Sequence, residues 1–164
     1  MGRALTYFSY NSRVGLVTIA ASETGITALS FGNTPIADAK CTPCALTNDA
    51  ATQIQEYFAG KRRTFDLPLD VSGTAFSEMV WKAIQAIPYG STMTATQIAE
   101  IIGKPESVRA VGSAISSAPT ELLIPVHRVV DAHGRARGTG KAARQHQHLV
   151  SFERARLSKD SEKQ

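Results

Sequence analysis

Cysteine, tryptophan and long apolar stretches are scarce in this sequence of 164 residues. It contains two cysteines, Cys41 and Cys44, and a single tryptophan. Two thiols are too few to hold a chain of this length together, which is typical of a reducing compartment. No apolar run approaches the roughly 20 residues of a membrane-spanning helix, and the first residues lack the apolar segment of a signal peptide. We therefore expect a cytoplasmic protein without a membrane partner.

An excess of either sign of charge is missing from the first half, and basic side chains outnumber acidic ones only in the second half. Residues 1–75 carry six basic and six acidic side chains, whereas residues 76–164 carry twelve basic and eight acidic ones, which gives the net charge of +4. A positive surplus confined to one half favours a polyanionic partner, such as DNA, for that half. A solubilising surface explains the same surplus, so charge alone leaves both explanations open.

Residues 1–75 have the pattern of a small α/β domain. Alternating or β-rich segments predict a meander of three strands, over 6–10, 14–20 and 25–31. A loop or short helix is expected around 36–46. Capping residues at 47–49 then predict a helix over 50–59, which ends at Gly60.

Residues 76–157 have a mostly helical pattern. Apolar spacing predicts helices over 75–87, 94–102 and 106–117, and the turn at Gly103 makes the last two a helix-turn-helix. A strand-like run follows at 122–130, and 135–140 is expected to return as a wing. A helix over 141–157 and a polar tail over 158–164 complete the chain.

Several motifs occur in an order that chance does not explain. They are Ile87-Pro88-Tyr89-Gly90, Ile98-Ala99, Arg109-Ala110-Val111-Gly112 and Ile124-Pro125-Val126-His127-Arg128-Val129-Val130. This series resembles the O6-alkylguanine-DNA alkyltransferase family, also called methylated-DNA–protein-cysteine methyltransferases. The resemblance implies a ribonuclease-H-like α/β domain followed by a winged helix-turn-helix domain. We further expect a monomer that needs no cofactor or metal.

The resemblance places Val126 where the family has its nucleophile. In the family a cysteine within Pro-Cys-His-Arg takes the alkyl group from guanine O6, and a histidine oriented by a glutamate activates it. The matching segment here is Pro125-Val126-His127-Arg128, with Glu153 in the last helix. Valine has no lone pair with which to attack. His127 and Glu153 are therefore expected to remain as a buried polar pair, and no residue is assigned as catalytic.

Three further positions depart from the family pattern. Ala95 stands where the family has a tyrosine that pushes on a DNA phosphate, and Ala118 where it has an asparagine that braces the active site. Thr139 or Gly140 replaces an aromatic residue near the flipped base. The resemblance assigns the lesion pocket to Pro125, Val126, Val129, Ile115, Thr139 and Gly140.

The resemblance also implies a DNA-binding surface. Its expected residues are Arg109, Thr94, Ala95, Thr96, Ala110, Gly112, Ser113, Arg128 and Arg137. Arg109 matches the arginine that fills the gap left by a flipped base. Small residues at 110 and 112 suit a close approach to a groove or, equally, tight helix packing. Arg128 meets a phosphate or, alternatively, braces the core, and Lys104, Arg135, Lys141 and Arg144 are further candidates for phosphates.

The remaining candidates for chemistry have ordinary explanations. Cys41 and Cys44 have the spacing of a redox or zinc pair, but a structural zinc site needs four ligands. We interpret them as small residues in a loop or helix start. His133, His146 and His148 are expected at the surface.

The sequence therefore predicts an alkyltransferase-like protein that binds O6-alkylguanine in double-stranded DNA without transferring the alkyl group. Nucleotide excision repair proteins are the expected partners. Two alternatives stay open. One is an active methyltransferase in which Val126 is an engineered replacement of the cysteine, and the other is a winged-helix binder with no role in repair.

Overall fold

The chain folds into two compact units. The structure, a computed structural model, describes residues 4–162, with side chains up to residue 159. The first unit comprises the chain as far as Ser72 together with Pro119–Leu123, and the second comprises Gly73–Ala118 and the chain from Ile124 onward. The return of Pro119–Leu123 to the first unit is a feature that the sequence patterns did not predict.

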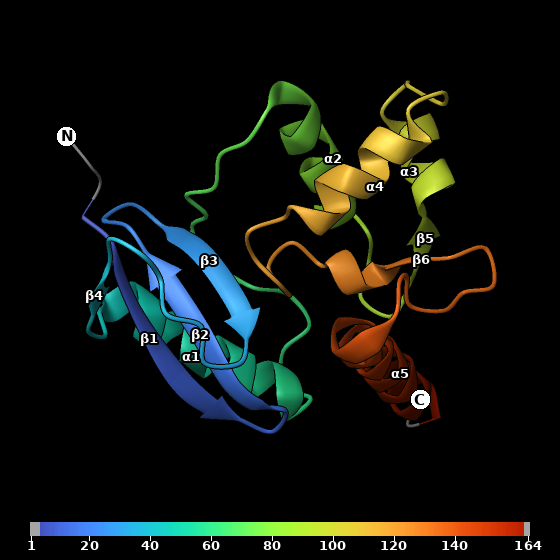
Figure 1. Cartoon of the computed structure of the whole chain (residues 1–164). Coiled ribbons are helices and arrows are strands. Elements are labelled where there is room, and N and C mark those ends of the chain that lie inside the picture. Colours follow the sequence, from blue (N-terminus) through green and yellow to red (C-terminus); the bar gives the residue numbers. More distant parts are fainter. Residues whose placement is uncertain (1–3, 163–164) are drawn as a thin grey trace. The chain divides into compact units, whose positions relative to one another are not determined.

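The first unit is a four-stranded sheet with a helix on one face (Figure 1). The strands are β1 (Thr6–Ser12), β2 (Gly15–Ala21), β3 (Ile26–Phe31) and β4 (Lys40–Cys41), in the order β3-β2-β1-β4. The first three pair antiparallel, as predicted, and β4 pairs parallel to β1. Helix α1 (Ala45–Phe58) covers the sheet, and Ile19, Leu29, Ile54 and Tyr57 are fully buried in the core.

Two details of the first unit differ from the prediction. The segment around 36–46 contains the short edge strand β4, which two residues are too few to reveal by periodicity. Helix α1 begins at Ala45, with Cys44 as its N-cap, rather than after Asp49. The reason lies in Thr47, whose hydroxyl accepts a hydrogen bond from the Cys44 backbone N–H at 2.9 Å and so acts inside the first turn.

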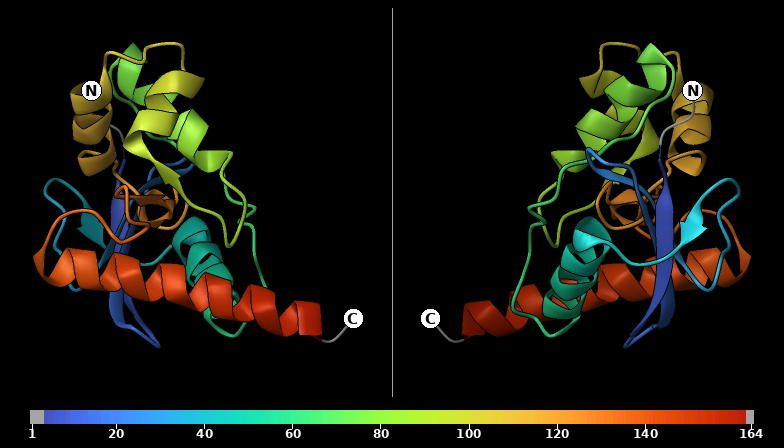
Figure 2. Two further views of the ribbon diagram at one scale, coloured as in Figure 1. Left: turned by 90° about the vertical axis from the view of Figure 1, so that its right-hand side faces the viewer. Right: turned by 90° about the vertical axis from the view of Figure 1, so that its left-hand side faces the viewer.

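The second unit contains three packed helices, a short parallel strand pair and a long final helix. Its elements are α2 (Ala75–Gln85), β5 (Met93–Thr94), α3 (Ala95–Ile101), α4 (Val108–Ser116), a 3₁₀ turn (Val126–Arg128), β6 (Val129–Val130) and α5 (Gly140–Glu162). Strands β5 and β6 pair parallel. Figure 2 shows α5 along its length. No helix within residues 4–162 is long and apolar enough to cross a membrane.

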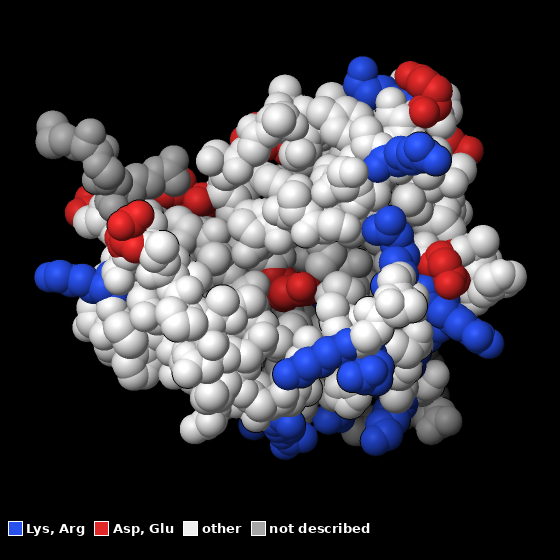
Figure 3. All heavy atoms as spheres, in the orientation of Figure 1, with Lys and Arg blue, Asp and Glu red and all other residues white. Residues whose placement is uncertain are grey.

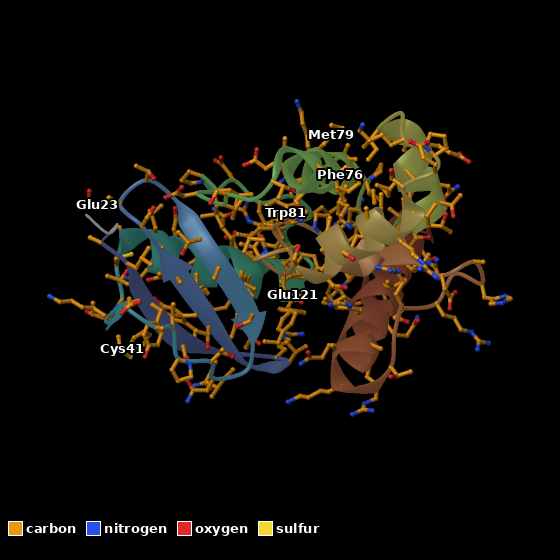
Figure 4. All side chains as sticks on the ribbon, turned by 45° about the horizontal axis from the view of Figure 1, so that its top comes forward. Glu23, Cys41, Phe76, Met79, Trp81 and Glu121 are labelled. Carbon is orange, nitrogen blue, oxygen red and sulfur yellow. The ribbon has the colours of Figure 1, made fainter. Side chains whose placement is uncertain are left out.

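The α2–α4 contact is fixed by a buried tryptophan. Trp81, labelled on α2 in Figure 4, donates its indole N–H to the Ala114 carbonyl of α4 at 2.8 Å. A Cβ at Gly73 would lie 2.7 Å from the Trp81 ring, so only glycine fits there. This contact sets the position of α4, the second helix of the predicted helix-turn-helix.

The predicted strand over 122–130 is wrong for most of its length. Leu122 has a positive φ of 63°, Val126–Arg128 form a 3₁₀ turn, and only Val129–Val130 pair as a strand. The run is buried on all sides, so its composition could not distinguish a strand from a compact turn. Helix α5 also continues to Glu162, five residues beyond its predicted end.

Candidate nucleic-acid interface

Helices α3 and α4 form the predicted helix-turn-helix. Thr94 caps α3, because its hydroxyl accepts from the Gln97 backbone N–H at 3.2 Å, and Gln97 Oε1 accepts from the Thr94 N–H at 2.8 Å. The turn between the helices uses Gly103 at a φ of 77°. The Thr94 hydroxyl thus has a structural role, while Thr96 remains exposed on α3.

Helix α4 and the wing line a pocket of about 650 Å³. The wing is the loop over residues 131–139, which Val130 and Ala136 close through an antiparallel bridge. The residues that line this α4–wing pocket are Ala95, Val108, Arg109, Gly112, Ser113, Ser116, Ser117 and Arg137. Five of them belong to the predicted DNA-binding set. The other three, Val108, Ser116 and Ser117, were not predicted, since nothing in their sequence spacing marks them as part of a binding surface.

Gly112 is the point at which the wing meets α4. A Cβ built at Gly112 would lie 2.9 Å from an Arg137 guanidinium nitrogen. The small residue at 112 therefore admits the wing arginine, a third explanation beside groove approach and helix packing. Ala110 is exposed on α4.

The α4–wing pocket is positively charged. Arg109 is exposed and Arg137 half-buried, and within the described part of the chain neither forms an ion pair. Figure 3 shows Lys and Arg side chains of the second unit gathered over α4, the wing and α5. Two guanidinium groups beside several hydroxyls suit an anion such as a phosphate.

A buried cluster of charged side chains lies under the 3₁₀ turn. His127 and Glu153 are each about 1% exposed, and His127 Nε2 donates to Glu153 Oε2 at 2.8 Å. Arg128 donates from Nε to Glu153 Oε1 at 2.9 Å and from a terminal nitrogen to Oε2 at 3.0 Å. The Gly90 backbone N–H adds a bond to Glu153 Oε1 at 3.2 Å. The predicted buried His127–Glu153 pair is present.

The prediction that Arg128 contacts DNA is corrected by this cluster. Its side chain is 9% exposed. Besides Glu153, it donates to the Ile87 carbonyl at 2.8 Å and lies over the Tyr89 ring. Because the Arg128 guanidinium is occupied by Glu153, the Ile87 carbonyl and the Tyr89 ring, it is not available to a DNA phosphate. Arg128 instead braces the core, as the alternative prediction had it. Gly90 and the Ile87 carbonyl were not predicted as parts of this cluster, although both lie in the motif at 87–90.

Burial and hydrogen bonding shift the titration of this cluster. Burial works to raise the pKa of Glu153, but hydrogen bonds from His127 and Arg128 and their charges outweigh it and lower the pKa to about 2. Burial lowers the pKa of His127. Glu153 is thus ionised and His127 neutral at pH 7. Because Nε2 carries the proton, Nδ1 is an acceptor, and it has no partner among the described residues.

Val126 lies directly before this cluster and is 5% exposed. Of the other residues predicted for the lesion pocket, Pro125, Val129 and Ile115 are buried, whereas Thr139 and Gly140 are exposed. Of the residues predicted to line the lesion pocket, the four apolar ones are thus buried, and the two at the end of the wing are exposed.

The two cysteines belong to the first unit. Cys41 is exposed on β4, and Cys44 caps α1. Burial works to raise the pKa of Cys44, but hydrogen bonds with Thr6, Thr47 and Leu46 outweigh it and lower the pKa. Across the described residues, no three His, Cys, Asp or Glu side chains converge in a way that could hold a metal ion.

Comparison with known protein families covers both units. Residues 5–71 match the ribonuclease-like domain of 6-O-methylguanine DNA methyltransferase, and residues 75–155 match the DNA binding domain of the same family. The chain belongs to the 6-O-methylguanine DNA methyltransferase family. The predicted fold class, an α/β ribonuclease-like domain with a helical DNA-binding domain, is confirmed.

Individual members of the family align along nearly the whole chain. The methylated-DNA–protein-cysteine methyltransferase of Mycolicibacterium paratuberculosis is 36% identical over 154 residues, which is 92% of this chain and 93% of that protein. A crystal structure of Mycobacterium tuberculosis O6-methylguanine methyltransferase is 35% identical, has a TM-score of 0.85, and covers 93% of this chain and 94% of its own. A structure of the M. tuberculosis protein in complex with DNA has a TM-score of 0.84 at 35% identity, over 92% of this chain and 94% of that one.

Proposed function

We propose that this protein binds double-stranded DNA through the α4–wing pocket and recognises O6-alkylguanine without accepting the alkyl group. The bound lesion then passes to another repair pathway, for which nucleotide excision is our candidate. The protein acts as a monomer in the cytoplasm.

Val126 is the observation that carries this proposal. Relatives of this chain are named for a protein cysteine that is methylated, and we align that cysteine with position 126 because of the motif Pro125-Val126-His127-Arg128. A valine has no thiolate, so the covalent step lacks its nucleophile. The neighbouring His127–Glu153 pair is intact, but Nδ1 of His127 has no thiol to deprotonate.

The α4–wing pocket supports DNA binding. Arg109 lies at the start of α4, exposed and without a carboxylate partner among the described side chains, where it is free to enter a helix groove. A relative of similar fold has been crystallised with DNA. Extruding a damaged base costs a few kcal/mol, and an inserted side chain offsets part of that cost.

Incubation with duplex DNA that carries O6-[methyl-³H]guanine tests the absence of transfer. We expect no radioactivity on the protein after denaturing electrophoresis. Stoichiometric label on any residue, the two cysteines included, would overturn the absence of transfer. The second candidate, an active methyltransferase whose cysteine was replaced at position 126, is favoured by the intact His127–Glu153 pair and is tested by transfer to Val126→Cys.

A gel shift with matched duplexes tests recognition. We expect tighter binding to the O6-methylguanine duplex than to the plain duplex, and a steep loss of both with salt. Equal affinity for both duplexes would instead support a winged-helix binder with no role in repair.

A further inference from the structure

The first turns of α5 carry an exposed basic stripe. It consists of Lys141, Arg144 and His148, all exposed and spaced three and four residues apart, so they share one side of the helix. Leu149, Val150 and Glu153, which are buried, lie on the opposite side.

This stripe works against the stability of α5. The N-terminus of a helix bears a partial positive charge, so cations in the first turn are unfavourable there. No acidic residue occupies the first turn of α5, and like charges on neighbouring turns repel. Helix α2 shows the opposite arrangement, with Glu78 in its first turn and Lys82 in its last. Lys141 lies in that first turn, and Arg144 repels it from three residues further on, so the two cations need an explanation other than the stability of the helix.

The stripe continues the α4–wing pocket along the chain. Arg137 of the pocket precedes the first residue of α5, Gly140, by three positions. Within the described residues, Lys141 and Arg144 form no ion pair. Residues 141 and 144 are separated by about 4.5 Å along the helix axis, and one DNA strand presents a phosphate about every 3.4 Å of its own axis.

We propose that Lys141 and Arg144 are a second contact with duplex DNA, made to backbone phosphates beyond those at the α4–wing pocket. The inference rests on the proposed function, since it assumes a bound duplex. The contact contributes affinity and salt dependence but no preference for the lesion, because phosphates carry no base identity. It also explains charges that the helix itself disfavours.

The test compares two full-length double variants of equal net charge. Lys141→Gln with Arg144→Gln removes the stripe, and Lys61→Gln with Lys82→Gln removes two exposed cations elsewhere. Duplex affinity is measured between 50 and 200 mM salt. Each lost phosphate contact reduces the slope of log K against log salt by about 0.9. We expect the first variant to lose about 1.8 from the slope, with a thermal midpoint unchanged or raised, and the control to keep the wild-type slope.

The outcomes separate the inference from the proposed function. No duplex binding by the wild type would overturn the proposed function and the inference together. Wild-type binding with an unchanged slope in the first variant, or an equal loss in both variants, would overturn the inference alone. A second variant, Lys141→Glu with Arg144→Glu, places favourable charges at the helix start. It should fold at least as well as the wild type and bind more weakly than the glutamine variant.

Discussion

Val126 has an inert side chain and is followed by His127, which is hydrogen-bonded to Glu153. Val126→Cys would place a thiol on the residue before His127, whose Nδ1 has no hydrogen-bond partner among the described residues. We nevertheless expect only slow transfer from O6-methylguanine DNA, because Ala95 and Ala118 lack the aromatic ring and the amide that the family uses for flipping and bracing. The measurement is single-turnover transfer of labelled methyl groups.

Val126→Ser is the matched control, since an alcohol oxygen is a far weaker nucleophile toward an alkyl carbon than a thiolate, and it should transfer nothing. Rapid transfer by Val126→Cys, at a rate similar to that of the active relatives, would show that Ala95 and Ala118 are harmless departures.

Glu153 makes the fold sensitive to acid. Its pKa falls from 4.5 in the unfolded chain to about 2 in the folded one, so its contribution is fully present above pH 4.5 and is lost as the pH falls toward 2. This shift is worth on the order of 3 kcal/mol. The lowered pKa of His127 acts in the same direction, since protonation of the buried ring below pH 6.5 favours unfolding. Urea unfolding at pH 7, 5 and 3 measures the loss.

Glu153→Gln is the control variant for this loss of folding stability at low pH. The variant is less stable at pH 7, because Arg128 loses its carboxylate, but its stability should change less between pH 5 and pH 3. If the free energy of unfolding of the variant falls as steeply between pH 5 and pH 3 as that of the wild type, the responsible carboxyl group is not Glu153.

Arg109 and Arg137 line one pocket from two elements, α4 and the wing. If Arg109 fills the gap left by a flipped base, Arg109→Ala should reduce the preference for lesion DNA several-fold and largely spare plain duplex. Arg137→Ala should weaken both substrates to a similar extent, as loss of a phosphate contact does. Paired titrations on lesion-bearing and plain duplexes distinguish the two. Equal losses for Arg109→Ala would mean that it is only a phosphate ligand.

Gly112→Ala separates the position of Arg137 from its charge. The new methyl group displaces the Arg137 guanidinium, which lies 2.9 Å from the added carbon, while all charges remain. Alanine in place of glycine stabilises a helix by up to about 1 kcal/mol. We therefore expect weaker duplex binding without loss of thermal stability. Unchanged binding would show that the Arg137–Gly112 contact has no role in recognition.

The spacing of apolar residues predicted the strands and helices that have one apolar face. It did not predict the conformation of segments that are buried on all sides or held by residues distant in sequence. The three strands and the stripe on α2 emerged from alternation and from three- and four-residue spacing. The run around Val126 did not, because its shape follows from Arg128 reaching both Glu153 and the Ile87 carbonyl. Similarly, α1 starts early because Thr47 bonds to Cys44, and its hydroxyl also accepts from Tyr10 on β1.

At the scale of the whole molecule, the first unit is not contiguous in sequence. Leu29 of β3 donates to the Pro119 carbonyl at 3.1 Å, and Glu121 donates to the Leu29 carbonyl at 2.9 Å. Thr120, between them, is fully buried. A chain that ends at residue 75 loses these bonds and the cover of that edge.

We therefore expect the fragment 1–75 to unfold at a lower urea concentration than the same fragment extended by a Gly/Ser linker and residues 117–124. Circular dichroism measures both midpoints. A linker with residues 117–124 in scrambled order is the control, and equal midpoints for all three would mean that the segment adds nothing to the unit.

The inert side chain at position 126 changes how many DNA lesions one protein molecule can handle. A protein that is alkylated on its own cysteine is spent after one event, so its capacity is the number of molecules present. If Val126 leaves binding reversible, each molecule returns to the pool, and the quantity that matters is how long it stays on a lesion. Selection would then act on the dissociation rate and on the arrival of the next repair step, rather than on the rate of synthesis.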